Sequence, residues 1–138
     1  MKTTPSPGNS INLRLRYPNT IGKLAEITAI LAAIGGSVGK IDVVASDRTH
    51  ITRDIVVNTT GDDHARTIVD AARAISDVQL VDTWDCTFRM HEGGKLEVIS
   101  TAPLNDYVDL SMAYTPGVAR VCQAIHKDPS TARDYTIR

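Results

Sequence analysis

Hydrophobic and polar residues alternate with two different periods along the first two thirds of the chain. A period of two indicates a strand with one buried face, and a period near 3.6 indicates an amphipathic helix. Residues 11–17 follow the period of two, because polar residues separate the apolar Ile11, Leu13, Leu15 and Tyr17. We therefore expect a half-buried strand over residues 11–17.

The first helix is predicted directly after this strand. Pro18 interrupts the alternation, and Asn19 and Thr20 are residue types that cap helix N-termini. A single helical face then collects the apolar residues Leu24, Ile27, Leu31 and Ile34. Gly35-Gly36 predicts the end of this helix, since glycine readily adopts the left-handed backbone conformation found there.

Two strands, a second helix and a last strand are predicted next. Residues 38–44 and 51–57 form the strands, and residues 46–49 between them have the composition of a hairpin loop. The helix begins at Gly61-Asp62-Asp63, and its apolar face carries Ile68, Ala71, Ala72 and Ile75. The last strand extends over residues 78–90, on the alternation of Val78, Leu80, Trp84, Cys86, Phe88 and Met90.

The order strand-helix-strand-strand-helix-strand predicts an α+β fold of the ferredoxin-like βαββαβ type. Two helices would cover one face of a four-stranded antiparallel sheet. We expect residues 1–9 to be disordered, residues 10–92 to form this domain, and residues 93–138 to form a separate tail. Because a domain of this size has a marginal core, we also expect a homodimer or a higher homo-oligomer.

Composition excludes several classes of partner. The 138 residues carry a formal net charge of -1, whereas nucleic acids and anionic membranes favour a basic face. No apolar run approaches the roughly 20 residues that span a bilayer, and Met1–Gly8 lacks the apolar core of a signal peptide. The two cysteines favour reduced thiols over a disulfide. We therefore expect a cytoplasmic protein that binds neither nucleic acid nor membrane.

The tail contains one strong helix signal. Thr115 is placed as N-cap and Pro116 as the first helical residue, where a missing N–H costs nothing. The apolar stripe comprises Val118, Val121, Cys122 and Ile125, and Asp128-Pro129 predicts its end. Residues 95–100 show a short strand-like alternation, so we expect the tail to contain a short strand and a helix. This helix requires a partner surface, which could be the small domain, another chain or further sequence.

The run Asp109–Ala119, with its Ala-Tyr-Thr-Pro-Gly-Val-Ala core, resembles the entry segment of the malic enzyme catalytic domain. The downstream Cys122–Pro129 fits the same family, and the resemblance extends from about Gly94 to Arg138. It implies an enzyme that oxidises malate with NAD or NADP, decarboxylates the product and protonates the enol of pyruvate.

Carried over by position, the resemblance makes Tyr114 the catalytic proton donor. A phenol has a reference pKa near ~10, so it is protonated at neutral pH and can donate to an enol carbon. The family's catalytic lysine, its Mg²⁺ or Mn²⁺ ligands and its nicotinamide-binding loop would lie beyond Arg138. We therefore expect no metal site and no cofactor in this fragment, which alone should be inactive.

The small domain resembles the ACT family over about Ser10–Arg89. Pro18–Ile27 is similar to that family's first strand-to-helix turn, with Gly22 at the characteristic glycine, and Gly36-Ser37-Val38 with Ile41 matches its second strand less closely. The resemblance implies regulation by an amino acid or another small metabolite. The residues expected nearest such an effector are Asn19, Thr20, Ile21, Gly22 and Ser37.

Two alternatives remain open from the sequence. Gly22 can serve close packing, and Asn19 or Thr20 can serve capping, in a domain that only dimerises. The chain can also be a stand-alone metabolite-binding ACT module that acts as a sensor or regulates an enzyme in trans. The tail motif favours the malic enzyme interpretation, because a free sensor has no use for Ala113–Gly117.

Overall fold

The computed structural model describes residues 4–137, which form two compact units. One unit ends at Lys95 and the other begins at Leu96. The sequence places the domain boundary between residues 92 and 93, three residues earlier. The two units are described separately below.

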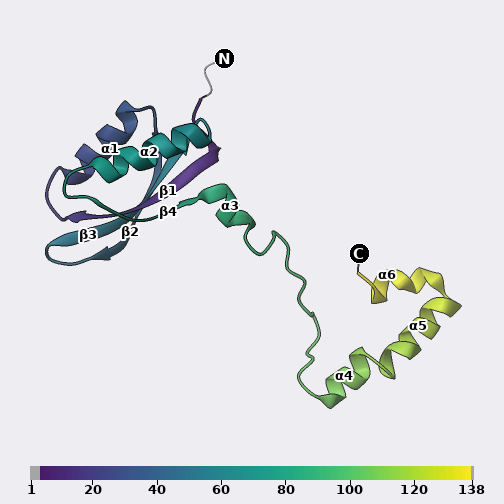
Figure 1. Ribbon diagram of the computed structural model, residues 1–138. Helices are drawn as coiled ribbons and strands as arrows, with labels where there is room; N and C mark the ends of the chain where they lie inside the picture. The colour runs from purple at the N-terminus through teal and green to yellow at the C-terminus, as the bar shows by residue number, and fades with distance from the viewer. Residues whose placement is uncertain (1–3, 138) are drawn as a thin grey trace. The chain divides into compact units, whose positions relative to one another are not determined.

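The first unit is built on a four-stranded sheet in the order β2-β3-β1-β4, and every neighbouring pair is antiparallel. Its strands are β1 (Ser6–Pro18), β2 (Ser37–Ser46), β3 (His50–Thr59) and β4 (Gln79–Asp85). Helices α1 (Lys23–Ala33) and α2 (Asp62–Ala74) lie together on one face of this sheet (Figure 1). The predicted α+β, ferredoxin-like arrangement is confirmed.

The core lies between the helices and the sheet. The apolar positions of the central strand β1 are buried, as their alternation predicts, and α1 and α2 contribute Ile27, Leu31, Ile68 and Ala72. On the opposite face, the Arg14 guanidinium binds the Asp54 carboxylate through Nε–Oδ1 and Nη2–Oδ2 contacts of 2.8 Å each. These hydrogen bonds hold the pKa of Asp54 below its usual value. The open face is therefore polar and carries an ordered ion pair.

Gly36 occupies a position that no other residue fits. A Cβ atom added there would lie 2.7 Å from Ile68 Cδ1, 2.8 Å from Val57 Cγ1 and 2.9 Å from the Leu31 carbonyl oxygen. The chain thus passes closely between α1, α2 and β3 before it enters β2. Gly35 has φ +89° and supplies the left-handed residue expected after the helix.

The N-terminal segment differs from its prediction. Strand β1 begins at Ser6, so residues 6–9 of the segment expected to be disordered are part of the sheet, and residues 1–3 lie outside the described residues. Thr59 Oγ1 donates to the Asn9 carbonyl at 2.7 Å, and Thr87 Oγ1 donates to the Gly8 carbonyl at 3.0 Å. These contacts come from distant parts of the chain, which local alternation does not reveal.

The predicted last strand is wrong beyond Asp85. Strand β4 ends there, and residues 86–91 form helix α3 (Cys86–His91). The Asp85 carboxylate caps this helix by accepting from the backbone N–H groups of Thr87 at 2.8 Å and Phe88 at 2.9 Å. The capping residue turns the chain out of the sheet, and Phe88 and Met90 are exposed instead of buried.

The second unit is helical. It contains α4 (Tyr107–Ala113), α5 (Gly117–Lys127), the 3₁₀ helix η1 (Pro129–Thr131) and α6 (Ala132–Tyr135). The predicted helix is α5: it starts at Gly117, with Pro116 as N-cap in place of Thr115, and it ends before Asp128 as predicted. Helix α4 was not predicted, although Asp106 caps it by accepting from the Asp109 N–H at 2.9 Å.

The short strand predicted over residues 95–100 is also wrong. Residues 96–100 have no regular secondary structure, and the described part of this unit contains no strand with which they could pair. A strand needs a neighbour for its backbone hydrogen bonds, so alternation alone does not produce one.

Candidate functional site

Tyr114 lies at the junction between α4 and α5. Its backbone N–H donates to the Leu110 carbonyl oxygen at 2.8 Å, and its own carbonyl accepts from the Val118 N–H at 2.7 Å. The first bond closes the last turn of α4, and the second belongs to the first turn of α5. The backbone of Tyr114 is therefore held from both helices.

The Tyr114 side chain is exposed to solvent. The residue is 72 % exposed, and the Thr115–Pro116 peptide bond that follows it is cis. An exposed phenol can donate a proton to a molecule brought against it, but it needs further groups to bind that molecule. Within the described residues of this unit, Tyr114 therefore does not by itself form a binding site.

A groove of about 420 Å³ lies beside this junction, over α4 and the start of α5. Its lining includes Tyr107, Val108, Met112, Pro116 and Gly117, and Arg120 is the one charged residue among the described residues that line it. Tyr114 does not line the groove. The groove is mainly apolar and would suit a packing partner better than a dicarboxylate.

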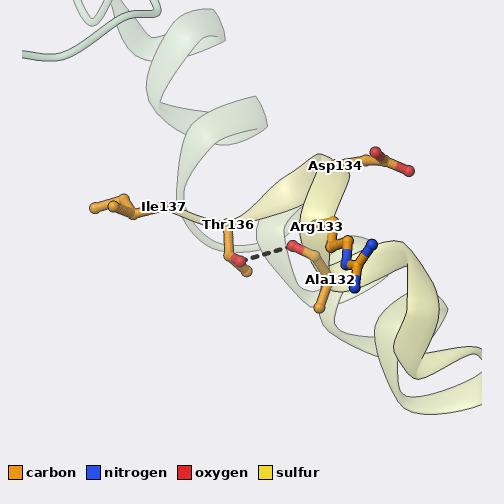
Figure 2. A pocket seen from close by; sticks show the side chains of 5 residues that line it. All are labelled: Ala132, Arg133, Asp134, Thr136 and Ile137. Atoms are coloured by element: carbon orange, nitrogen blue, oxygen red, sulfur yellow. Dashed lines mark hydrogen bonds between the residues drawn. The ribbon is translucent and has the colours of Figure 1, made fainter.

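A second hollow lies at the C-terminal end of this unit. Figure 2 shows its lining residues, which are Ala132, Arg133, Asp134, Thr136 and Ile137. Thr136 Oγ1 donates to the Ala132 carbonyl at 2.6 Å, so one of its polar side chains already serves the end of α6. Tyr114 is not part of this hollow either.

The five residues expected around an effector do not form one cluster within a single chain. Asn19, Thr20, Ile21 and Gly22 follow the end of β1, where the Asn19 N–H donates to the Thr49 carbonyl at 2.9 Å. Ser37 pairs with Asn58, which in turn pairs with Ser10 near the beginning of β1. The loop and Ser37 therefore lie at opposite ends of the sheet.

The start of α1 also differs from its prediction. Gly22 is the N-cap, with φ +88°, and no side chain caps the helix. Asn19 and Thr20 thus do not serve the capping role that the sequence suggests, and Ile21 is fully exposed. The loop leaves its polar side chains available at the surface.

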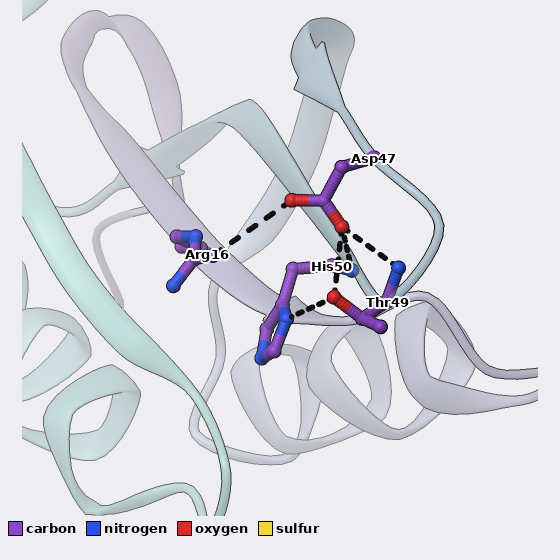
Figure 3. Close-up of polar contacts among 4 residues, drawn as sticks. All are labelled: Arg16, Asp47, Thr49 and His50. Atoms are coloured by element: carbon purple, nitrogen blue, oxygen red, sulfur yellow. Dashed lines mark hydrogen bonds and ion pairs between the residues drawn. The ribbon is translucent and has the colours of Figure 1, made fainter.

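A polar hairpin around Asp47 adjoins this loop through the Asn19–Thr49 hydrogen bond and was not among the residues expected near an effector. Asp47 Oδ1 accepts from the His50 N–H at 2.7 Å, from the Thr49 N–H at 2.7 Å and from Thr49 Oγ1 at 2.9 Å (Figure 3). These donors, the His50 N–H first, lower the pKa of Asp47 to about 2. Arg16 Nη2 lies 3.8 Å from Asp47 Oδ2. The only sequence signal for these hydrogen bonds was an aspartate, Asp47, at the start of the predicted hairpin loop.

Comparison with known proteins identifies the second unit. The family described as "Malic enzyme, N-terminal domain" matches residues 93–138, the segment that contains Tyr114. The chain therefore carries a malic enzyme N-terminal segment. A NAD-dependent malic enzyme of Rhizobium meliloti is 53% identical over 45 residues, which are 33% of this chain and 6% of that protein.

Two malic enzymes also match the first unit. The NAD-dependent malic enzyme of Geobacillus stearothermophilus is 40% identical over 129 residues, which are 94% of this chain and 27% of that protein. NAD-dependent malic enzyme 1 of Bacillus subtilis is 30% identical over 125 residues, 90% of this chain and 28% of that protein. The chain thus spans little more than a quarter of the length of these curated relatives.

The metal and nicotinamide cofactor of a malic enzyme do not fit the residues present. Across residues 4–137, no three His, Cys, Asp or Glu side chains gather in a way that could hold a metal ion. Gly35–Gly39 leads into β2 instead of opening a helix, so it is not a dinucleotide-binding loop. Helices long and apolar enough to cross a bilayer are likewise absent from the described part of the chain.

Proposed function

We propose that this chain is the regulatory and leading part of a malic enzyme that converts malate to pyruvate and CO2 with NAD⁺ or NADP⁺. The observation that carries the proposal is the match over residues 93–138, in which Tyr114 is held between two helices. Relatives named for NAD and for NADP both match this segment, so the proposal includes either cofactor. The fragment by itself is proposed to be inactive.

In this proposal, Tyr114 donates the proton that converts enolpyruvate to pyruvate. The phenolic O–H bond breaks and a C–H bond forms at the enol methylene carbon, while the enolate oxygen becomes the ketone. The resulting phenolate must regain a proton from a neighbouring acid. The exposure of Tyr114 supports this role, because the phenol is free to meet a substrate bound by other parts of the enzyme.

The first unit is proposed to be an ACT-type module that pairs with a second copy and binds an amino acid or another small metabolite. Strand β2 supports pairing: it is an edge strand, and Ile41, Val43 and Val44 on it are exposed. Asn19, Thr20, Ile21 and Gly22 would contact the effector, and Ser37 would have to come from a neighbouring copy. The two free thiols, Cys86 and Cys122, suit a reducing compartment, and we propose the cytoplasm.

The catalytic assignment is tested by replacing Tyr114 with Phe in the intact enzyme. Loss of the proton donor should lower kcat by about 10²- to 10⁴-fold, the usual contribution of a general acid. Steady-state kinetics would measure the effect, and a circular dichroism spectrum equal to that of the wild type would exclude misfolding. Wild-type turnover in this variant would contradict the assignment.

A stand-alone sensor or trans-acting regulator is the second candidate, since the first unit has its own core. The mass of the native product, by immunoblot from its source cells, separates the two candidates. A band far above 14.9 kDa supports the enzyme, and a band at that mass supports the sensor.

A further inference from the structure

Gly117 lies where α5 approaches the end of α4 most closely. A Cβ atom added to it would collide with the Met112 carbonyl oxygen, and it would lie 2.5 Å from the Ser111 carbonyl oxygen and 2.7 Å from Met112 Cα. All three atoms belong to the backbone of α4. They cannot turn aside as the end of a flexible side chain can.

The requirement for glycine here is spatial. Gly117 is the first residue of α5, and the residues with positive φ do not include it. The backbone conformation at this position would not disfavour alanine, since alanine has a high helix propensity. Only the contact with α4 excludes it, so any side chain at this position must push the two helices apart.

This contact is next to both hydrogen bonds that hold Tyr114. Leu110, which accepts from the Tyr114 N–H, lies in α4, and Val118, which donates to the Tyr114 carbonyl, directly follows Gly117. A displacement of α5 relative to α4 would therefore move the two anchors of Tyr114 apart. The phenol would move with its backbone.

We propose that Gly117 is a positioning residue, whose missing side chain sets the place of the Tyr114 hydroxyl relative to the substrate. This inference rests on the proposed role of Tyr114 as proton donor. Proton transfer requires donor and acceptor within hydrogen-bond reach, and a misplacement of about 1 Å can cost roughly 10²-fold in rate. Gly117→Ala should thus reduce proton transfer by about 10- to 10²-fold and have little effect on substrate binding.

The test measures exchange of the pyruvate methyl hydrogens with D2O, followed by NMR, in the intact enzyme supplied with nicotinamide cofactor and divalent cation. Removal of a methyl proton is the reverse of enol protonation, so the assay reports on the donor without a full turnover. Gly39→Ala is the matched control. A Cβ at Gly39 would make only ordinary contacts, 3.6 Å from the Val56 carbonyl oxygen and 3.7 Å from Val56 Cγ1.

A second variant guards against a folding failure of Gly117→Ala. Val118→Pro, in the first turn of α5, removes the N–H that donates to the Tyr114 carbonyl and places a ring carbon against that carbonyl. The preceding residue is a glycine, which has no Cβ to clash with the proline ring. This variant displaces the Tyr114 carbonyl without adding a side chain at position 117.

The expected result is slow exchange in Gly117→Ala, Val118→Pro and Tyr114→Phe, with Gly39→Ala at the wild-type rate and KM for malate within about twofold in every variant. Normal exchange in Gly117→Ala would overturn the positioning role, and Val118→Pro decides the same point if Gly117→Ala does not fold. In either case, slow exchange in Tyr114→Phe would leave the proposed function standing. Normal exchange in Tyr114→Phe would overturn both. A uniform rise in KM with loss of thermal stability would reduce Gly117 to a packing residue and overturn the inference.

Discussion

At the residue scale, Asp47 shows how one carboxylate organises a turn. It accepts three hydrogen bonds from Thr49 in the turn and from His50, the first residue of β3, and its own N–H donates to the His50 carbonyl at 2.9 Å. The three bonds that the carboxylate accepts, the one from the His50 N–H first, favour its ionised form and therefore lower its pKa. This turn also positions the Thr49 carbonyl, which accepts a hydrogen bond from the Asn19 N–H of the neighbouring loop.

Asp47 predicts an acid-dependent loss of stability. Its pKa is about 2 in the folded chain, below the ordinary value of 3.8, so ionisation favours folding above pH 4 and that contribution disappears as the pH falls towards 2. In Asp47→Asn this contribution is absent at every pH. Urea unfolding at pH 7, 4 and 2 should show a steeper decline for the wild type than for the variant, and parallel declines would contradict the prediction.

At the element scale, α3 shows a cap overriding a strand pattern. The alternation of apolar residues continues from β4 through Met90, yet the chain becomes helical at Cys86. The Asp85 carboxylate accepts hydrogen bonds from the backbone N–H groups of Thr87 and Phe88. If the strand continued past the end of the sheet, these N–H groups would have no partner strand. Arg89 of this helix lies over the Trp84 ring, 4.8 Å from its centroid, and ties α3 back to β4.

Removal of the cap should melt α3 and leave the sheet intact. Asp85→Ala is expected to cost about 0.5–2 kcal/mol of local stability, the usual value of an N-cap. Amide hydrogen exchange at Thr87 and Phe88 would accelerate, whereas exchange in β1 would stay at the wild-type rate. Asp82→Ala, which removes a carboxylate from the same strand without uncapping a helix, is the control, and equal protection in both variants would refute the capping role.

At the scale of the whole molecule, the two units differ in how their apolar residues are used. The buried core runs from Ile11 to Ile75 and belongs entirely to the first unit. Among residues 96–137 no side chain is buried, and Leu96, Val98, Tyr107 and Met112 are among those exposed. A segment of this kind lacks the burial that offsets the entropy of ordering a chain.

The two units should therefore behave differently when separated. A fragment that ends at Lys95 is expected to unfold cooperatively, with a thermal midpoint within a few degrees of the whole chain. A fragment that begins at Leu96 should show no cooperative transition. Circular dichroism during heating would measure both, and a cooperative transition in the second fragment would show that it has a core of its own.

The sequence by itself determined most elements of the first unit and the family of the second. Local periodicity predicts which face of a strand or helix is buried, so nearby residues alone were enough to predict β1, α1, β3 and α2. The Tyr-Thr-Pro-Gly motif likewise indicated the malic enzyme family, which the family match over residues 93–138 confirms.

The tertiary structure decided what depends on residues distant in the sequence. Pairing with β3 and contacts with Thr59 extended β1 back to Ser6, and the register of β2 placed Ser37 at the opposite end of the sheet from Asn19. The need for glycine at 36 and 117 arises from atoms of other elements that occupy the space of a side chain. Periodicity records which face is buried, but only the packed chain shows which atoms meet there.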